Sequence, residues 1–284
     1  MSNPDTTAQG TASTYIYISD AARAGRFLDL RELWAYRELL WVLTARDIKV
    51  RYKQTVLGIA WAVIQPVLIM IVFSIFFGRL AGVPSEGYPY PVFVYAGLLP
   101  WTFFANAVSH SSNSIITSTN LITKVYFPRL IIPLSSIGAA IVDFLIATVI
   151  MFLLMLYYDM PFTSNLLFTP LLLLAVIFIA LGIGAWLAAL NVAFRDFRYV
   201  VPFMIQIWLF ITPVIYPVNL IPENWQWLYY LNPMTGLIEG FRSAFLGKPF
   251  DVVGPAISFT VAIACFIIGV WYFKRVERRF ADII

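Results

Sequence analysis

Long apolar stretches alternate along the chain with short polar segments that carry most of its charge. Positions 54–78, 87–123, 160–194, 199–222 and 252–273 contain no Asp, Glu, Lys or Arg, and 131–157 contains only Asp143. Each stretch can supply the roughly 20 apolar residues that cross a hydrocarbon core about 30 Å thick. The pattern predicts an all-α membrane protein with six transmembrane helices, near residues 57–77, 92–115, 131–157, 166–190, 199–216 and 255–273.

Composition agrees with this pattern and excludes a water-soluble domain. Hydrophobic residues make up 61% of the 284 positions and charged residues 12%, whereas soluble domains have about 45–50% and about 25%. The formal net charge of +4 raises the question of a nucleic-acid partner. The positions of the basic residues favour a membrane topology signal instead, so we expect no nucleic acid.

The basic residues predict the orientation of the chain in the membrane. If both termini are cytoplasmic, only Arg79, Arg242 and Lys248 of the 19 lysines and arginines fall on the outer side. This is the positive-inside asymmetry of proteins with an even number of crossings. We therefore expect a multi-pass protein of the bacterial cytoplasmic membrane with both termini inside the cell.

The segment before the first span reads as two parts. Residues 1–30 are small and polar and predict a flexible cytoplasmic tail. Apolar positions then recur at helical spacing over 31–50, with Trp34 and Trp41 beside them and charged residues between. This predicts an amphipathic helix in the cytoplasmic interface, with an ordinary surface helix as the alternative.

The segment between the fifth and sixth spans is too interrupted for a full crossing. Pro222, Pro233 and Pro249 break its apolar pattern. Short re-entrant helices on the outer face fit better, because protein then shelters the non-helical backbone. Within this segment, Glu239 and Arg242 are three positions apart and could form an ion pair with each other or with a partner subunit.

The residue types for catalysis are sparse. His110 is the only histidine, Cys265 the only cysteine, and Asp143 the only firm carboxylate in a span. Asp143 should point into the bundle and act in structural hydrogen bonding, and His110 fits a polar contact better than a ligand. The segment around Gly240 lacks the spacing of a phosphate-binding loop. We expect no metal site, no cofactor in this chain and no enzyme activity.

Aromatic side chains are frequent in the spans, and most must contact lipid or pack in the core. A minority that faced an internal conduit would offer stacking surfaces to sugar rings, whose C–H faces are apolar. Gln65 and Asn106 are polar groups that could serve the hydroxyls of such rings.

Five ordered segments resemble a known family. They are RDIKVRYKQT at 46–55 leading to Leu57-Gly58, LITKVYFPR at 121–129, Asn191 followed by Arg195-Asp196, PVIYP at 213–217 and NPM at 232–234. Together they resemble the ABC-2 export permeases, most closely the polysaccharide branch with the O-antigen, teichoic-acid and capsule exporters. The resemblance covers about 33–280, so 31–284 would form one transmembrane domain. Thr212 stands where related sequences often have Ser.

The resemblance implies partners and roles. Two copies would form the channel, with two separate ATPase subunits that hold ATP and Mg beneath it. Residues expected to act in coupling to the ATPase are Asn120, Leu121, Ile122, Lys124, Arg46, Asp47 and Arg51. Residues expected to line the conduit between the first and fifth spans are Trp61, Gln65, Trp208, Phe210 and Tyr216. Residues expected in gating or structural roles are Pro213 and Pro217, which would kink the fifth helix, with Arg195, Asp196, Glu239 and Arg242.

The function that follows is the permease subunit of an ATP-driven exporter that moves lipid-linked polysaccharide outward. One alternative is an ABC-2 exporter of a drug or small lipid. An alternative of another class is a membrane-embedded enzyme that acts on lipid-linked sugars, which would need a convergent set of acids, bases or metal ligands. A secondary transporter would need more intramembrane acids than Asp143.

Overall fold

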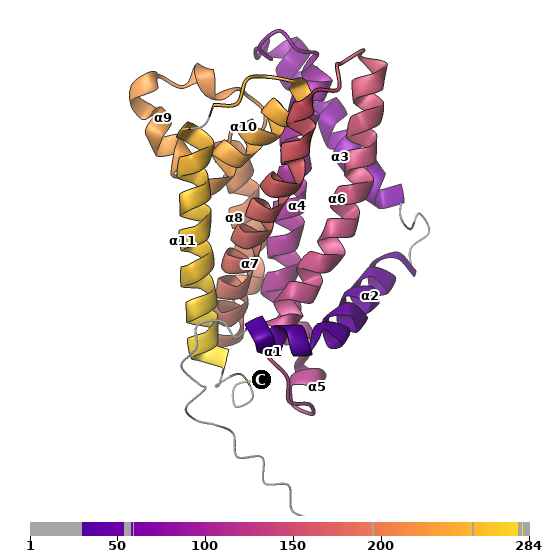
Figure 1. The fold of residues 1–284 in the computed structure, drawn as a ribbon, viewed down its shortest axis with the longest axis vertical. Coiled ribbons are helices and arrows are strands. Elements are labelled where there is room, and N and C mark those ends of the chain that lie inside the picture. Colours follow the sequence, from indigo (N-terminus) through magenta and orange to yellow (C-terminus); the bar gives the residue numbers. More distant parts are fainter. Residues whose placement is uncertain are drawn as a thin grey trace, which may run out of the picture.

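A computed structural model of the protein describes residues 30–53, 58, 60–194, 196–251, 253–277 and 280. Residues 1–29 of the predicted tail and the predicted site residue Arg195 lie outside the described residues. Within the described part the chain is almost entirely helical and contains no strand (Figure 1). The prediction of an all-α protein is confirmed.

Five helical segments are long and apolar enough to cross a membrane. They comprise α3 (Ala60–Phe73) with a π-helical extension (Ser74–Leu80), α4 (Tyr90–Thr117), α6 (Ile131–Tyr157), a 3₁₀ turn (Ser164–Phe168) with α7 (Thr169–Ala193), and α11 (Val253–Val276). The shorter helices are α1 (Leu30–Ala35), α2 (Arg37–Lys53), α5 (Thr119–Ile122), α8 (Phe197–Ile211), α9 (Glu223–Tyr230) and α10 (Pro233–Leu246), with a 3₁₀ turn at Val218–Leu220.

Helix α8 is the apolar helix that falls short of a full span. It has 15 residues and ends at Ile211, whereas the sequence predicted a span to 216. The residue before a proline is disfavoured in helical conformation, and Thr212, which precedes Pro213, is extended with ψ 137°. The expectation that Pro213 and Pro217 kink this helix is therefore wrong, because both follow its end.

The core of the bundle is built around α4, most of which is buried. Helix α7 packs against it and against α11, and its small residues allow close approach. A Cβ added to Gly269 of α11 would clash with the carbonyl oxygen of Gly182 in α7. The backbones of α7 and α11 are thus in direct contact at this point.

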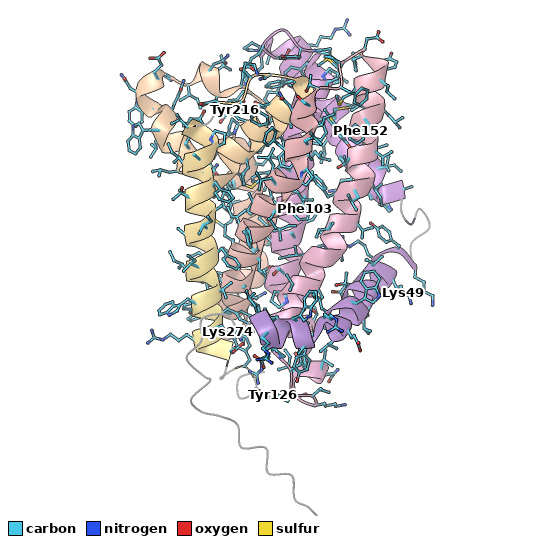
Figure 2. The ribbon with its side chains drawn as sticks, in the orientation of Figure 1. Lys49, Phe103, Tyr126, Phe152, Tyr216 and Lys274 are labelled. Atoms are coloured by element: carbon cyan, nitrogen blue, oxygen red, sulfur yellow. The ribbon has the colours of Figure 1, made fainter. Side chains whose placement is uncertain are left out.

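The two ends of the bundle differ in what they carry (Figure 1). Helices α1 and α5 and the C-terminal end of α11 lie at the lower end, and α9 and α10 at the upper end. Lys49, Lys274 and Tyr126 lie toward the lower end in Figure 2, and Tyr216 and Phe152 toward the upper. Of the segments predicted to be cytoplasmic, α1, α5 and the described C-terminal end of α11 are therefore gathered at one end of the molecule.

The predicted interface helix is two helices, α1 and α2, with a turn at Tyr36. Leu43 and Thr44 of α2 are buried, whereas Trp41 and Val50 are 72% and 71% exposed. Apolar residues therefore occur both on the side of α2 that faces the bundle and on its exposed side, so α2 is less amphipathic than the sequence suggested. The side that faces the bundle also carries polar side chains, Asp47 and Arg51, which bond to α6.

Candidate functional site

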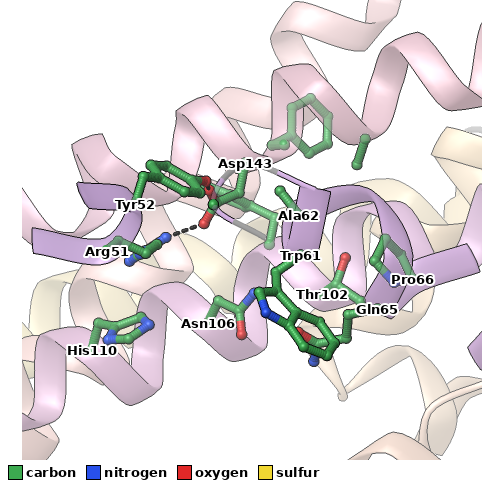
Figure 3. A pocket seen from close by; sticks show the side chains of 14 residues that line it. Arg51, Tyr52, Trp61, Ala62, Gln65, Pro66, Thr102, Asn106, His110 and Asp143 are labelled. Carbon is green, nitrogen blue, oxygen red and sulfur yellow. Dashed lines mark hydrogen bonds and ion pairs between the residues drawn. The ribbon is translucent and has the colours of Figure 1, made fainter. Parts of the chain in front are cut away.

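A cleft of about 290 Å³ lies between the end of α2, α3, α4 and α6 (Figure 3). Two of the predicted conduit residues, Trp61 and Gln65, line it from α3. Side chains of α4 line it at helical spacing, and α6 supplies Asp143. The residues that supply its polar or aromatic lining are Arg51, Tyr52, Trp61, Gln65, Thr102, Phe103, Asn106, His110, Asp143 and Phe144.

A series of polar contacts between α2 and α6 leads to one wall of the cleft, which Arg51, Tyr52 and Asp143 line. Ser135 donates a hydrogen bond to Asp47 at 3.1 Å. One turn further along α2 and two turns further along α6, the Arg51 guanidinium forms an ion pair with Asp143, and the Tyr52 hydroxyl donates to the same carboxylate. These contacts fix α2 against α6 and compensate the charge of Arg51 at the edge of the cleft.

Burial and the hydrogen bond to Asp143 raise the pKa of Tyr52 above its ordinary value. The hydroxyl therefore stays protonated at any physiological pH and remains a donor to the carboxylate. A carboxylate that accepts bonds from both a guanidinium and a phenol is held in one orientation. The sequence placed Asp143 in the bundle interior in a hydrogen-bonding role, and the structure contains these bonds.

The opposite wall combines one aromatic face with uncommitted polar groups. Trp61 is 50% exposed, and Gln65 lies one helical turn further along α3 on the same side. Among the described residues, the side chains of Gln65, Asn106 and His110 make no hydrogen bond to the protein, whereas Thr102 donates to the Leu99 carbonyl oxygen at 3.1 Å. These groups are available to a ligand.

The other three predicted conduit residues do not join this cleft. Trp208 packs against Phe104, with ring centroids 5.1 Å apart, and donates from Nε1 to Asn232 at 3.1 Å. Phe210 is 54% exposed on α8. The Tyr216 hydroxyl donates to the Ile211 carbonyl oxygen at 3.3 Å. The five residues therefore do not form one site within a single chain.

Four of the predicted coupling residues lie on or beside α5, at the lower end of the bundle (Figure 1). Asn120 and Lys124 are exposed, Leu121 is half-buried, and Ile122 is 6% exposed. Ile122 therefore anchors the short helix and cannot be a direct contact with a partner in this conformation. Tyr126, which is not among the residues named for coupling, is 85% exposed in the same loop.

The remaining predicted coupling residues are used within the chain. Arg46 forms an ion pair with Asp47 at 2.8 Å, Asp47 accepts from Ser135, and Arg51 is paired with Asp143. Asp196 precedes α8, is exposed and makes no side-chain capping bond. The structure thus gives Asp47 and Arg51 a role in holding α2 on α6.

Glu239 and Arg242 pair with each other on α10, with 2.6 Å between Glu239 Oε1 and Arg242 Nη1. Arg242 is fully buried, lies 3.8 Å from the centre of the Phe93 ring, and donates to the carbonyl oxygens of Val214 and Tyr216 at 2.8 and 3.2 Å. We name this group the Arg242 clasp. It ties α4, α10 and the turn after α8 together.

Within the described part of the chain, no group of three or more His, Cys, Asp or Glu side chains is placed to hold a metal ion. The lining of the cleft combines an aromatic face, amides, an imidazole and a compensated ion pair.

Long apolar helices, charges gathered at the ends and a cleft within the bundle define a multi-spanning integral membrane protein. Residues 38–246 match the family model described as ABC-2 type transporter, and the chain belongs to that family.

Its relatives include permeases for polysaccharides. The chain is 30% identical to the O-antigen export system permease protein RfbA of Klebsiella pneumoniae over 87% of this chain and 95% of the relative. It is 32% identical to the protein of the same name in Myxococcus xanthus over 76% and 83%. It is 27% identical to the polysialic acid transport protein KpsM of Escherichia coli over 72% and 80%. These relatives support the polysaccharide-export branch.

Proposed function

We propose that the chain is the membrane subunit of an ATP-driven exporter that moves a lipid-linked polysaccharide across the bacterial cytoplasmic membrane. The observation that carries the proposal is the similarity to O-antigen export permeases along 95% of a relative's length. That match extends over 248 residues and 87% of this chain, which is far more than one shared segment. The cleft beside Trp61 and Gln65 supports it, because its lining suits a polyhydroxylated ligand better than a purely apolar one.

In this proposal the active unit contains two copies of the chain and two ATPase subunits. The exposed side chains at the tip of the α4–α6 connection, Asn120, Lys124 and Tyr126, supply the surface for the ATPase. ATP and Mg bind in that partner and not in this chain. The exposed apolar faces of α3 and α8 contact lipid or the second copy.

We further propose six crossings with both termini in the cytoplasm. Helix α8 would be the fifth crossing despite its 15 residues, with the turn at 212–217 continuing it toward the outer surface. Helices α9 and α10 would then be re-entrant elements on the outer side, which the buried environment of α10 supports. Cysteine-accessibility labelling at exposed positions of α5 and α9, from each side of sealed vesicles, would test this orientation.

The function is tested by purifying the tagged chain with the products of neighbouring genes and measuring ATPase activity in nanodiscs. We expect a stoichiometric ATPase partner whose activity rises when lipid-linked glycan is added. A complex that responds to a drug or small lipid but not to glycan would favour the alternative cargo. A chain that purifies without any ATPase would contradict the exporter proposal.

A further inference from the structure

We propose that the cleft between α2, α3, α4 and α6 is a subsite for a single sugar ring of the exported glycan, complete within one copy of the chain. Trp61 would cover one face of the ring, and Gln65 and Asn106 would bond its hydroxyls. The inference rests on the proposed function and adds to it the place where one chain recognises its cargo. It differs from the conduit suggested by the family resemblance, which would lie between two copies.

The lining is arranged by helical periodicity on both sides of the cleft. Trp61 and Gln65 are four positions apart on α3 and therefore lie on one face. Thr102, Asn106 and His110 follow at the same spacing on α4. Figure 3 shows Asn106 beside Trp61 and Thr102 beside Gln65. An aromatic face with amides at its edge matches a pyranose, which has apolar C–H faces and a polar rim.

The charge of the cleft favours a neutral ligand over a phosphate. Arg51 is the one cation among the lining residues, and its guanidinium is paired with Asp143. An anion that entered would have to compete with this carboxylate for the guanidinium and would be repelled by it. The remaining polar groups are amides, hydroxyls and an imidazole, which can both donate and accept hydrogen bonds. Sugar hydroxyls need this combination.

The size of the cleft restricts the ligand to one ring. Pockets for drug-sized molecules occupy about 300–1,000 Å³, and this cleft of about 290 Å³ lies at the lower limit. Phe103, Phe144 and Ala147 provide an apolar floor. The uncommitted amides of Gln65 and Asn106 would lose little by binding, because among the described residues they have no hydrogen bond to break.

The test measures sugar binding directly, in the complete complex in nanodiscs. Saturation-transfer NMR would be recorded with the methyl glycosides of mannose, galactose and N-acetylglucosamine, with inorganic pyrophosphate as a competitor. We expect at least one glycoside to bind and pyrophosphate not to displace it. Trp61→Leu should weaken binding about fivefold, since an aromatic contact contributes about 1 kcal/mol. Gln65→Leu should have a similar effect through one lost hydrogen bond.

Matched controls separate the subsite from general damage. Trp186→Leu removes a tryptophan that is 43% exposed on α7 and does not line the cleft, and Gln206→Leu removes an exposed amide of α8. Both should bind the glycoside as the parent does. Trp61→Phe keeps an aromatic face and should retain most of the binding, which shows that the Trp61→Leu loss is not unfolding.

The outcomes are distinguishable from those of the proposed function. If no glycoside binds, if pyrophosphate displaces it, or if Trp61→Leu and Gln65→Leu bind as the parent does, the subsite is wrong. The exporter proposal still stands in that case if lipid-linked glycan stimulates the ATPase of the same preparation. If glycan gives no stimulation in the parent complex, the proposed function fails whatever the glycosides do.

Discussion

Two arginine–carboxylate pairs connect elements of the bundle, one between α2 and α6 and one on α10, and they differ in how completely the protein encloses them. The guanidinium of Arg242 is 0% exposed and is held by Glu239, two backbone carbonyls and the Phe93 ring. The side chains of Arg51 and Asp143 are 22% and 16% exposed and border the cleft. A guanidinium–carboxylate pair is therefore enclosed by protein at Arg242, whereas at Arg51 it forms part of the wall of the cleft.

The difference shows what enclosure does to an ion pair. A fully buried charge has no access to water, so its partners must all come from the protein and losing one is costly. A pair at the edge of a cavity keeps partial solvation, which lowers the free energy lost when one partner is removed. We therefore expect the Arg242 clasp to govern stability and the Arg51–Asp143 pair to govern the properties of the cleft.

The largest effect is expected from Arg242→Met. The substitution leaves Glu239 without its cation and the carbonyl groups of Val214 and Tyr216 without their donor. The free energy of unfolding should fall by about 3–5 kcal/mol, measured by thermal or denaturant unfolding of the purified chain in detergent. Arg79→Met, at an exposed arginine, is the control and should change it by less than about 0.5 kcal/mol. Equal effects of the two substitutions would contradict the role of the clasp.

A smaller effect is expected from Asp143→Asn. The amide can still accept one hydrogen bond, so the free energy of unfolding should fall by about 1–2 kcal/mol. The variant should also change the chemistry of the cleft, because Arg51 becomes an uncompensated cation. Pyrophosphate, which we expect the parent to bind poorly, should then bind and compete with a methyl glycoside in saturation-transfer NMR. Unaltered anion binding would show that Asp143 does not set the charge of the cleft.

A loss of thermal stability smaller than that of Asp143→Asn is expected from Gly138→Ala on α6. The added methyl group would lie 3.0 Å from the Thr44 side chain of α2, which is tighter than ordinary contact. Combining it with Thr44→Ala, which removes both the methyl group and the hydroxyl that would lie 3.0 Å from the added group, should restore most of the loss. A double-mutant cycle of thermal stability measures this. If the two changes are additive, α2 does not pack on α6 at this point.

The smallest effect on stability is expected from Lys124→Glu. The Lys124 side chain is exposed and, among the described residues, makes no hydrogen bond or ion pair, so the stability of the purified chain should change by less than about 0.5 kcal/mol. Its effect should appear only in the complex, as a loss of glycan-stimulated ATPase activity with normal membrane insertion. Arg79→Glu reverses a charge at the opposite end and should leave coupling unchanged. Coupled activity in Lys124→Glu at the parent level would reject the coupling role.

Local patterns in the sequence were enough to predict most of the helices. The predicted span at 131–157 coincides with α6, because hydrophobicity and length decide such a helix. The fifth span was predicted too long because Pro213 forces Thr212 out of the helix, a local rule that the apolar pattern hides. Reading that rule into the sequence would have placed the end of α8 correctly.

Pairing between side chains far apart in the sequence was harder to predict. Asp143 was expected to face the interior, yet its partners Arg51 and Tyr52 lie about 90 positions earlier and no periodicity links them. The five residues predicted to line the conduit do not lie together for the same reason, because their contacts depend on packing between helices far apart in the sequence. Trp61 and Gln65 face the cleft, whereas Trp208 turns toward Asn232, and the packing of α8 against α4 decides this rather than its own sequence.

The contact between Gly182 and Gly269 limits the ways in which the molecule can move. Because backbone atoms of α7 and α11 are in contact there, the two helices cannot slide or roll past each other without a backbone clash. The two helices therefore move as one rigid unit. Any opening that lets cargo through must be carried by helices whose contacts are made by side chains, which can exchange partners. The contact between α2 and α6 at Gly138 is of that kind, because the Thr44 side chain makes it. The cleft lies where α2 and α3 meet the rest of the bundle.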